Sequence, residues 1–284
     1  NPAELTDPAV RRAVITARDI PAGLGDMDSS LYLLFKAIRR QSTVALSGES
    51  ADEVFGGYRW FHDDVATKAE TFPWLAFGNS MRDSARWQIL EPGLRERLGL
   101  EQYVADQYSA ALKEIEYLPG ESEAERNMRR VCHLHLTRFV RMLLDRKDRA
   151  SMAVGLEVRV PFCDHRLVEY VYNTPWSLKS FDGREKSLLR HATKHVLPRS
   201  VVERVKSPYP STQDPGYAAA LQQQAKQILA EGDSELFGLI DRDWLQRAVS
   251  QDSTRMEPDV RMGLDRVIDL HTWLELYSPD LQLG

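Results

Sequence analysis

The chain has 284 residues, of which 43% are hydrophobic and 28% charged, a composition typical of a globular protein with a sizeable core. Its formal net charge of −5 argues against a protein that binds nucleic acid or a membrane surface. The apolar runs are far shorter than the ~18 residues expected of a membrane span, and the first residues lack the pattern of a signal peptide. We therefore expect a cytoplasmic protein that uses neither nucleic acid nor membrane as a partner.

The two cysteines, Cys132 and Cys163, are too few for a disulfide framework. Their small number favours a reducing compartment such as the cytoplasm. We expect both side chains to be small buried hydrophobic groups rather than reactive thiols.

The first predicted elements are a helix at residues 28–40 and a short buried strand at residues 42–46. Asp28 or one of the serines after it can cap the helix, and apolar residues recur along it at helical spacing. The strand leads directly into the loop at residues 47–53. In an open α/β sheet ligands bind beyond the carboxyl ends of strands, so this loop is a candidate site.

The remainder of the chain shows mainly helical patterns. Predicted helices span residues 101–118, 122–150, 164–173, 184–196, 215–231, 235–249 and 258–277. Residues 204–217 contain three prolines and are the clearest predicted loop. We expect a predominantly helical chain with one or few strands. Because one strand cannot make a sheet, either further strands escape detection or the rest of the sheet lies outside this chain.

The loop after the strand has two interpretations. It begins Ser47-Gly48-Glu49 and continues with the acids Asp52 and Glu53. Small residues let backbone amides approach a ligand, and an acid there can act as a general base or bind an amine or a ribose. The alternative is a helix N-cap, where acids are favoured by the helix dipole. The spacing alone leaves both open.

Basic residues gather near the end of the helix at residues 122–150. Arg146, Lys147 and Arg149 lie where the helix dipole favours cations, without any need for a function. Further on, Glu157 and Arg159 are two residues apart in an extended stretch and would share one face. We expect them to form a buried structural pair.

The predicted helix at residues 184–196 begins with two cations. Arg184 and Lys186 fall in its first turn, where the dipole disfavours positive charge, so a bound anion would compensate. The alternative is a solvated first turn. His191 and His195 share a helix face, but no third ligand stands at a matching spacing, and we expect no metal site there.

Residues 25–30, GDMDSS, are similar to the S-G-G-x-D-S loop that binds pyrophosphate in N-type ATP pyrophosphatases. The Ser-Gly-Gly opening is missing, and no apolar strand precedes the segment. We interpret it as a turn and a helix cap.

Four segments in order resemble the synthetase domain of glutamine-hydrolysing, class B-type asparagine synthetases. They are LSGESADEVFGGY, DRASMAVGLEVRVPFCDHRLVEYVY, GREKSLLR and RVKSPYPST. The match is collinear from about residue 20 to about residue 217. The resemblance implies an α/β fold of the adenine nucleotide alpha hydrolase type, with a parallel sheet and helices.

The resemblance also implies a reaction. ATP and Mg²⁺ activate aspartate as a β-aspartyl-adenylate with release of pyrophosphate. Ammonia, produced from glutamine by an N-terminal glutaminase domain, then displaces AMP to give asparagine. The chain would belong to an ATP-binding ligase of amino-acid biosynthesis, with aspartate, ATP and glutamine-derived ammonia as substrates, and a homodimer is compatible with this picture.

The match assigns expected roles to individual residues. Ser47, Gly48 and Glu49 match a loop near the nucleotide and the adenylate, and Glu49 is the candidate base that deprotonates ammonium. Asp52 matches an acid linked to nucleotide or Mg²⁺ binding. Lys186 matches a lysine that contacts the α-phosphate and stabilises the charge developing there.

Three further basic residues match the family. Arg146 matches a basic position near the active site, and Arg204 and Lys206 match the basic pair of a mobile loop that grips pyrophosphate. No protein-only metal site is expected within the chain, although Asp52 could contact Mg²⁺.

The sequence also departs from the family. It contains neither the S-G-G-x-D-S loop nor the glutaminase domain, and neither Cys132 nor Cys163 can replace a nucleophile that needs a free N-terminal amine. We expect residues 1–284 to be the C-terminal portion of one synthetase domain, whose missing N-terminal part is a partner. About residues 20–62 would end the α/β core, about residues 63–284 would form a helical part, and the chain alone would be inactive.

Two alternatives remain open. Synthetases similar to β-lactam synthetases or lasso-peptide cyclases use the same adenylating scaffold on other carboxylates and often close a ring. A non-catalytic helical interaction domain is the second alternative, which loss of Glu49 or Lys186 would have favoured.

Overall fold

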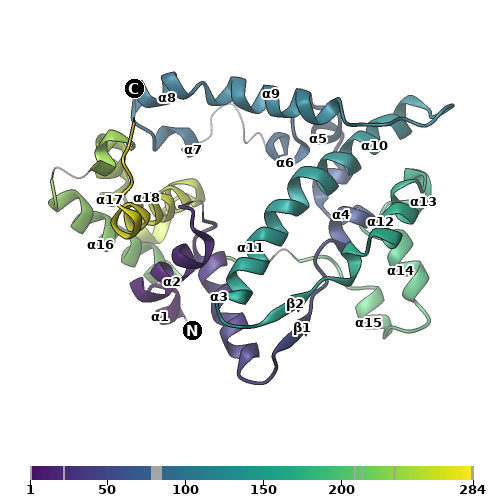
Figure 1. The fold of residues 1–284 in the computed structure, drawn as a ribbon, viewed down its shortest axis with the longest axis horizontal. Helices are drawn as coiled ribbons and strands as arrows, with labels where there is room; N and C mark the ends of the chain where they lie inside the picture. The colour runs from purple at the N-terminus through teal and green to yellow at the C-terminus, as the bar shows by residue number, and fades with distance from the viewer. Residues whose placement is uncertain are drawn as a thin grey trace.

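The structure is a computed structural model that describes residues 2–21, 23–77, 85–207, 209–212, 214–232 and 235–282. This part of the chain is predominantly helical and contains two short strands (Figure 1). The prediction of a mainly helical chain with few strands is therefore confirmed. No helix in the described ranges combines the length and the apolar character needed to cross a membrane.

The two strands, β1 (Val44–Leu46) and β2 (Glu157–Arg159), pair in parallel, with Ala45 opposite Val158. The pairing continues one residue beyond β1, where the N–H of Ser47 donates to the carbonyl of Arg159 at 2.9 Å. The predicted strand at residues 42–46 is confirmed, although it begins at Val44. Strand β2 is the stretch that sequence reasoning recognised only as extended. The two-stranded sheet thus pairs residues before residue 62, where the α/β core was expected to end, with residues well after it.

The expected burial of the Glu157–Arg159 pair is wrong. The two side chains form an ion pair at 2.8 Å, but they are 56% and 61% exposed. Alternate residues of a strand face opposite sides, and it is Val158 that packs against the buried cluster around Leu31 and Phe35. An ion pair this exposed contributes little to stability.

The predicted helix at residues 122–150 is confirmed and is longer. It comprises α10 (Glu123–Leu134), a π-helical turn (His135–Phe139) and α11 (Val140–Met152). The hydroxyl of Ser122 caps it by accepting from the N–H of Glu125 at 3.3 Å. In Figure 1 this helix crosses the molecule, with α16–α18 on one side and α12–α15 on the other.

Shorter helices surround the long one. Before it lie α1 (Pro2–Leu5), α2 (Pro8–Arg18), α3 (Asp26–Arg39), α4 (Ala51–Phe55), α5 (Asp64–Lys68), α6 (Pro73–Ala76), α7 (Ala85–Gln88), α8 (Pro92–Leu98) and α9 (Leu100–Leu112). After it lie α12 (His165–Tyr172), α13 (Trp176–Lys179), α14 (Ser187–Thr193), α15 (Arg199–Val202), α16 (Pro215–Ala230), α17 (Arg242–Val249) and α18 (Pro258–Tyr277). Short 3₁₀ turns occur at Arg59–His62, Pro161–Cys163, Glu235–Gly238 and Ser253–Arg255.

Several helix ends differ from prediction. Helix α9 ends at Leu112 rather than residue 118, α14 begins only at Ser187, and the predicted helix at 235–249 is a 3₁₀ turn followed by α17. The local pattern did not predict α2.

The segment GDMDSS is a turn that leads into a helix, as predicted, but the predicted cap is wrong: α3 begins at Asp26, and its N-cap residue Gly25 makes no side-chain cap hydrogen bond. Gly25 precedes the helix with φ of 59°, a conformation that favours glycine. The carboxylate of Asp28, in the first turn, reaches back to accept from the N–H of Leu24 at 2.7 Å.

The helices α16, α17 and α18 share a core of their own. Its fully buried members include Leu221, Leu245 and Leu264. Helix α2 is attached to this unit by Arg11, whose guanidinium is buried between the carboxylates of Asp265 and Asp269 on α18.

Candidate active site at the end of strand β1

The loop after β1 is held by its backbone rather than by a side-chain cap. Ser50 takes the N-cap position of α4 with φ of 74° and makes no side-chain cap hydrogen bond. Its hydroxyl instead lies 2.7 Å from the Sγ of Cys163. Cys163 is thus only half-buried and in polar contact, contrary to expectation, whereas Cys132 is 3% exposed as expected.

Asp52 lies between two lysines that come from distant parts of the chain. Lys186 Nζ is 2.7 Å from Oδ1 of Asp52, and Lys206 Nζ is 2.7 Å from Oδ2. Burial works to raise the pKa of Asp52, but the hydrogen bonds and charges of the two lysines outweigh it and hold that pKa below its usual value. The structure therefore brings together three of the predicted site residues around an ionised carboxylate.

The backbone around α14 places both lysines. Lys186 is the N-cap residue of α14, with φ of 57°, rather than a first-turn residue as predicted. Its positive charge is balanced by Asp52. The N–H of Lys206 donates to Oε1 of Glu185 at 3.1 Å, and Arg190 holds the same oxygen at 2.6 Å.

A second ion pair lies on the same loop. Nζ of Lys147, on α11, is 2.6 Å from Oε2 of Glu49 and donates to Oγ of Ser47 at 2.6 Å. That hydroxyl also accepts from the N–H of Glu49 at 3.2 Å. Next to it, an added Cβ on Gly48 would meet no atom within 4 Å, so the loop is open at this point.

Two predicted site residues lie elsewhere. Arg146 points toward the start of α3, where its guanidinium binds the Asp28 carboxylate and donates to the carbonyl of Met27 at 2.7 Å. Arg204 is exposed in the segment after α15, and its N–H donates to the carbonyl of Val201. Their expected contacts with substrate stay predictions.

Sequence reasoning missed the partners behind the loop. Glu53 is 0% exposed and accepts from the hydroxyl of Tyr58 at 2.6 Å, and Nζ of Lys206 lies 4.8 Å from the centre of the same ring. Burial raises the pKa of Glu53 to about 7. No local pattern distinguishes Glu53 from Asp52 beside it, so the sequence gives no signal for its burial.

Asp52 can help to hold a metal ion only if substrate phosphates supply further ligands. Across the described ranges, no three or more His, Cys, Asp and Glu side chains are grouped so that they could hold a metal ion. Mg²⁺ is commonly bound by one or two carboxylates together with substrate phosphates, and two lysines beside a carboxylate suit such phosphates. Asp52, Lys186 and Lys206 therefore fit a magnesium–polyphosphate group.

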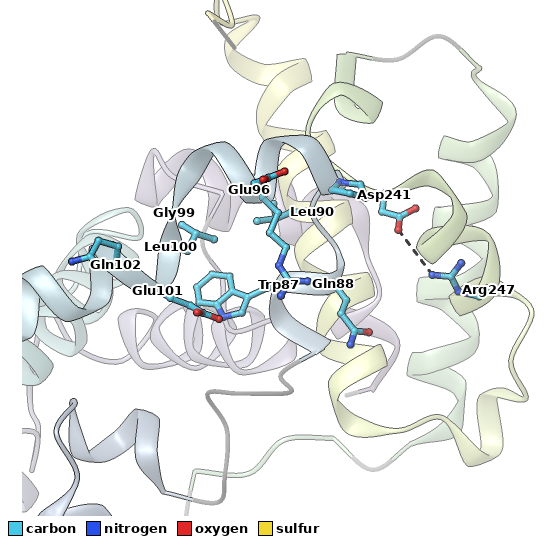
Figure 2. Close-up of a pocket in the computed structure, with 12 residues that line it drawn as sticks. Trp87, Gln88, Leu90, Glu96, Gly99, Leu100, Glu101, Gln102, Asp241 and Arg247 are labelled. Atoms are coloured by element: carbon cyan, nitrogen blue, oxygen red, sulfur yellow. Dashed lines mark ion pairs between the residues drawn. The ribbon is translucent and has the colours of Figure 1, made fainter.

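A separate cleft of about 690 Å³ lies between helices α7–α9 and α17 (Figure 2). Trp87 and Leu100 line it together with charged side chains, including Asp241 and Arg247, which form an ion pair at 4.0 Å. None of the predicted site residues lines this cleft. The chemistry expected from the sequence is thus concentrated at the end of β1.

At this junction of strand and helix, acids are paired with lysines, as expected of the family that the sequence resembles. Comparison with known proteins agrees with that resemblance. A sequence model of the asparagine synthase family matches residues 1–275. The chain belongs to the asparagine synthase family. The match extends well beyond the segments at about residues 20–217 that carry the resemblance in sequence.

Matches to individual proteins are more specific than the match to the family model. The chain is 38% identical over 274 residues to glutamine-hydrolysing asparagine synthetase 3 of Bacillus subtilis (strain 168), a match covering 94% of this chain and 43% of the relative. It is 28% identical to asparagine synthetase 1 of the same organism, over 63% of this chain and 32% of the relative. It is 25% identical to the amidase chyE of Penicillium rubens, over 86% of this chain and 43% of the relative. The chain thus spans less than half the length of these relatives.

Proposed function

We propose that the chain carries the C-terminal portion of the ammonia-using synthetase domain of an ATP-dependent ligase, which converts aspartate to asparagine through a β-aspartyl-adenylate. The observation that carries the proposal is the cluster that Asp52 forms with Lys186 and Lys206, close in sequence to Glu49. Family membership and the relative at 38% identity support the same reaction.

Each charged group has a role that follows from its position. A bound magnesium ion would supply positive charge to the phosphates of ATP. Asp52 is the carboxylate that would hold it, and Lys186 and Lys206 would then pair with phosphate oxygens. From the resemblance to the family, we assign Lys186, at the start of α14, to the α-phosphate. Lys206, on a loop, takes the pyrophosphate that leaves.

Glu49 serves the second half of the reaction. Ammonium is the main form of the nucleophile near pH 7, but only the uncharged amine can attack a carbonyl carbon. Glu49 accepts the proton, the new C–N bond forms, and the bond between the acyl carbon and the AMP oxygen breaks. Its place at the open end of the loop, next to Gly48, supports this assignment.

We also propose that the chain is the C-terminal portion of a synthetase domain. The proposal is supported by the share of the relatives that it spans, 43% for the relative at 38% identity. The pyrophosphate loop, the rest of the parallel sheet and the glutaminase would then come from the remainder of the full-length protein.

The test uses the full-length protein that carries this chain. Aspartate-dependent exchange of labelled pyrophosphate into ATP reports adenylation, and asparagine formed with added ammonia reports the second step. We expect both. If ammonia yields asparagine without release of pyrophosphate, the adenylate route is wrong.

One relative is named an amidase, which supports the alternative that the substrate is a carboxylate other than aspartate. A screen of the exchange reaction with aspartate, glutamate and β-amino acids that can close a ring separates the two. Exchange supported by a ring-forming substrate but not by aspartate would replace the asparagine assignment.

A further inference from the structure

Three neighbouring cations on α11 pair with different carboxylates. Arg146 binds Asp28 at the start of α3, and Arg149 binds Asp19 and Asp145. Both therefore join elements of the fold. Lys147 instead reaches the loop of the candidate site and binds Glu49.

The contact is enclosed and directional. The side chains of Lys147 and Glu49 are 14% and 22% exposed, and Nζ of Lys147 is held by two acceptors, Oε2 of Glu49 and Oγ of Ser47, each at 2.6 Å. An ammonium group therefore already fills one cation position at the carboxylate proposed as the base.

This arrangement treats charged and uncharged amines differently. A second cation brought to the Glu49 carboxylate must displace the Lys147 ammonium or lie beside it, and like charges at such distances repel. An uncharged amine meets no such repulsion and can donate a hydrogen bond to the carboxylate.

We propose that Lys147 is a specificity-determining residue, which weakens the binding of ammonium beside Glu49 and so favours an uncharged amine, while ammonium that does bind still gives its proton to Glu49. The inference rests on the proposed function, since it takes Glu49 to face the nucleophile.

The experiment compares two nucleophiles in the full-length protein at about pH 8. Ammonia is then mainly protonated, whereas hydroxylamine is mainly uncharged. Lys147→Met removes the charge and keeps most of the side-chain length. We expect it to lower the KM for ammonium about threefold or more, the range of a partly buried ion pair, with the KM for hydroxylamine unchanged.

Controls separate charge from general effects. Lys226→Met removes the same charge from the exposed face of α16 and is expected to change neither KM. Lys147→Arg keeps the cation and should therefore keep the KM for ammonium above that of Lys147→Met. Lys147→Gln repeats the test if Lys147→Met does not fold.

The outcomes are distinct. A KM for ammonium that is unchanged or raised in Lys147→Met overturns the inference, and so does an equal fall for both nucleophiles, which would indicate relief of a steric block. Absence of aspartate-dependent pyrophosphate exchange in the wild type overturns the proposed function instead, and the inference with it.

Discussion

At the scale of single residues, the loop after β1 contains three acids in three different electrostatic settings. Glu49 is paired with one lysine, Asp52 with two, and Glu53 is buried with only the hydroxyl of Tyr58 as its hydrogen-bond partner in the described residues. Neighbours in sequence therefore have different roles. The paired acids face the candidate site, whereas Glu53 belongs to the packing behind it.

Glu49→Gln tests the base directly. Gln keeps the size of the side chain but cannot accept a proton from ammonium, so asparagine formation should fall by about 10²-fold or more. Aspartate-dependent pyrophosphate exchange should stay within about twofold of the wild type, because adenylation precedes the proton transfer. A parallel fall of exchange and amide formation would show that Glu49 acts earlier.

Glu53 predicts a pH dependence of stability. Its pKa is raised from 4.5 to about 7 in the folded protein, so the unfolded chain ionises first as pH rises. Stability is therefore lost between about pH 4.5 and 7, by as much as about 3 kcal/mol. Glu53→Gln cannot ionise and can still accept from Tyr58.

Denaturant unfolding at about pH 4.5 and 8 checks this. The stability of Glu53→Gln relative to the wild type should increase by roughly 2–3 kcal/mol across that interval. Glu101→Gln, at an exposed position on α9, should show no such change. A pH-independent difference for Glu53→Gln would mean that Glu53 is ionised in the folded protein throughout.

At the scale of elements, the loop between α15 and α16 is anchored at both ends. Near its start, the N–H of Lys206 binds Glu185. Near its end, the Asp26 carboxylate of α3 accepts from Oγ of Ser211 at 3.0 Å and from the N–H of Thr212 at 2.5 Å. Arg261 of α18 donates to both Ser211 and Thr212. We infer that α3 and α18 together determine where Lys206 can reach.

Asp26→Ala should release the distal anchor. We expect faster amide hydrogen exchange in residues 203–212 and a KM for ATP raised about threefold to tenfold, with a smaller change of kcat at saturating ATP. Asp259→Ala, an exposed position on α18, is the matched control. Unchanged exchange in this loop would show that Asp26 does not hold it.

At the scale of the whole molecule, buried ion pairs join the N-terminal helices to the C-terminal unit. Arg11 is 6% exposed and contacts both Asp265 and Asp269, and the hydroxyl of Tyr217 also donates to Asp265 at 2.7 Å. Burial raises the pKa of Asp269 to about 6 even with the opposing charge of Arg11. The buried ion pairs between α2 and α18 in the described residues thus share one guanidinium.

Arg11→Met should cost about 3–5 kcal/mol of stability, because it leaves two carboxylates buried without a cation. The carboxylates then take up protons more readily in the folded state, so the loss should grow as pH rises from about 5 to 8. Arg12→Met is the matched control, since Arg12 is 52% exposed and its ion pair with Glu275 is long, at 3.8 Å. Equal unfolding free energies for the two variants would contradict the proposed role of Arg11.

Much of the secondary structure follows from the sequence alone because it is determined locally. Apolar spacing located the helices that became α3, α10–α11, α16 and α18, and the apolar run before Ser47 located β1. Strand β2 was not identified, since charged Glu157 and Arg159 flank its one apolar residue and leave no apolar run like that of β1. The motif around Glu49 and the lysines at 186 and 206 indicated the family for the same reason: their spacing is visible in the chain itself.

Only the tertiary structure decided which charged side chains form ion pairs with one another. Adjacent residues on a helix point about 100° apart, so Arg146 and Lys147 look equivalent in sequence yet contact different elements. The path of two loops brings Lys186 and Lys206 to Asp52, and the packing of α4 buries Glu53. The sequence by itself determined the helices, the strand before the loop and the chemistry available to the protein. The long-range contacts determined which of those groups share a site, because ion pairs between distant segments depend on the whole fold.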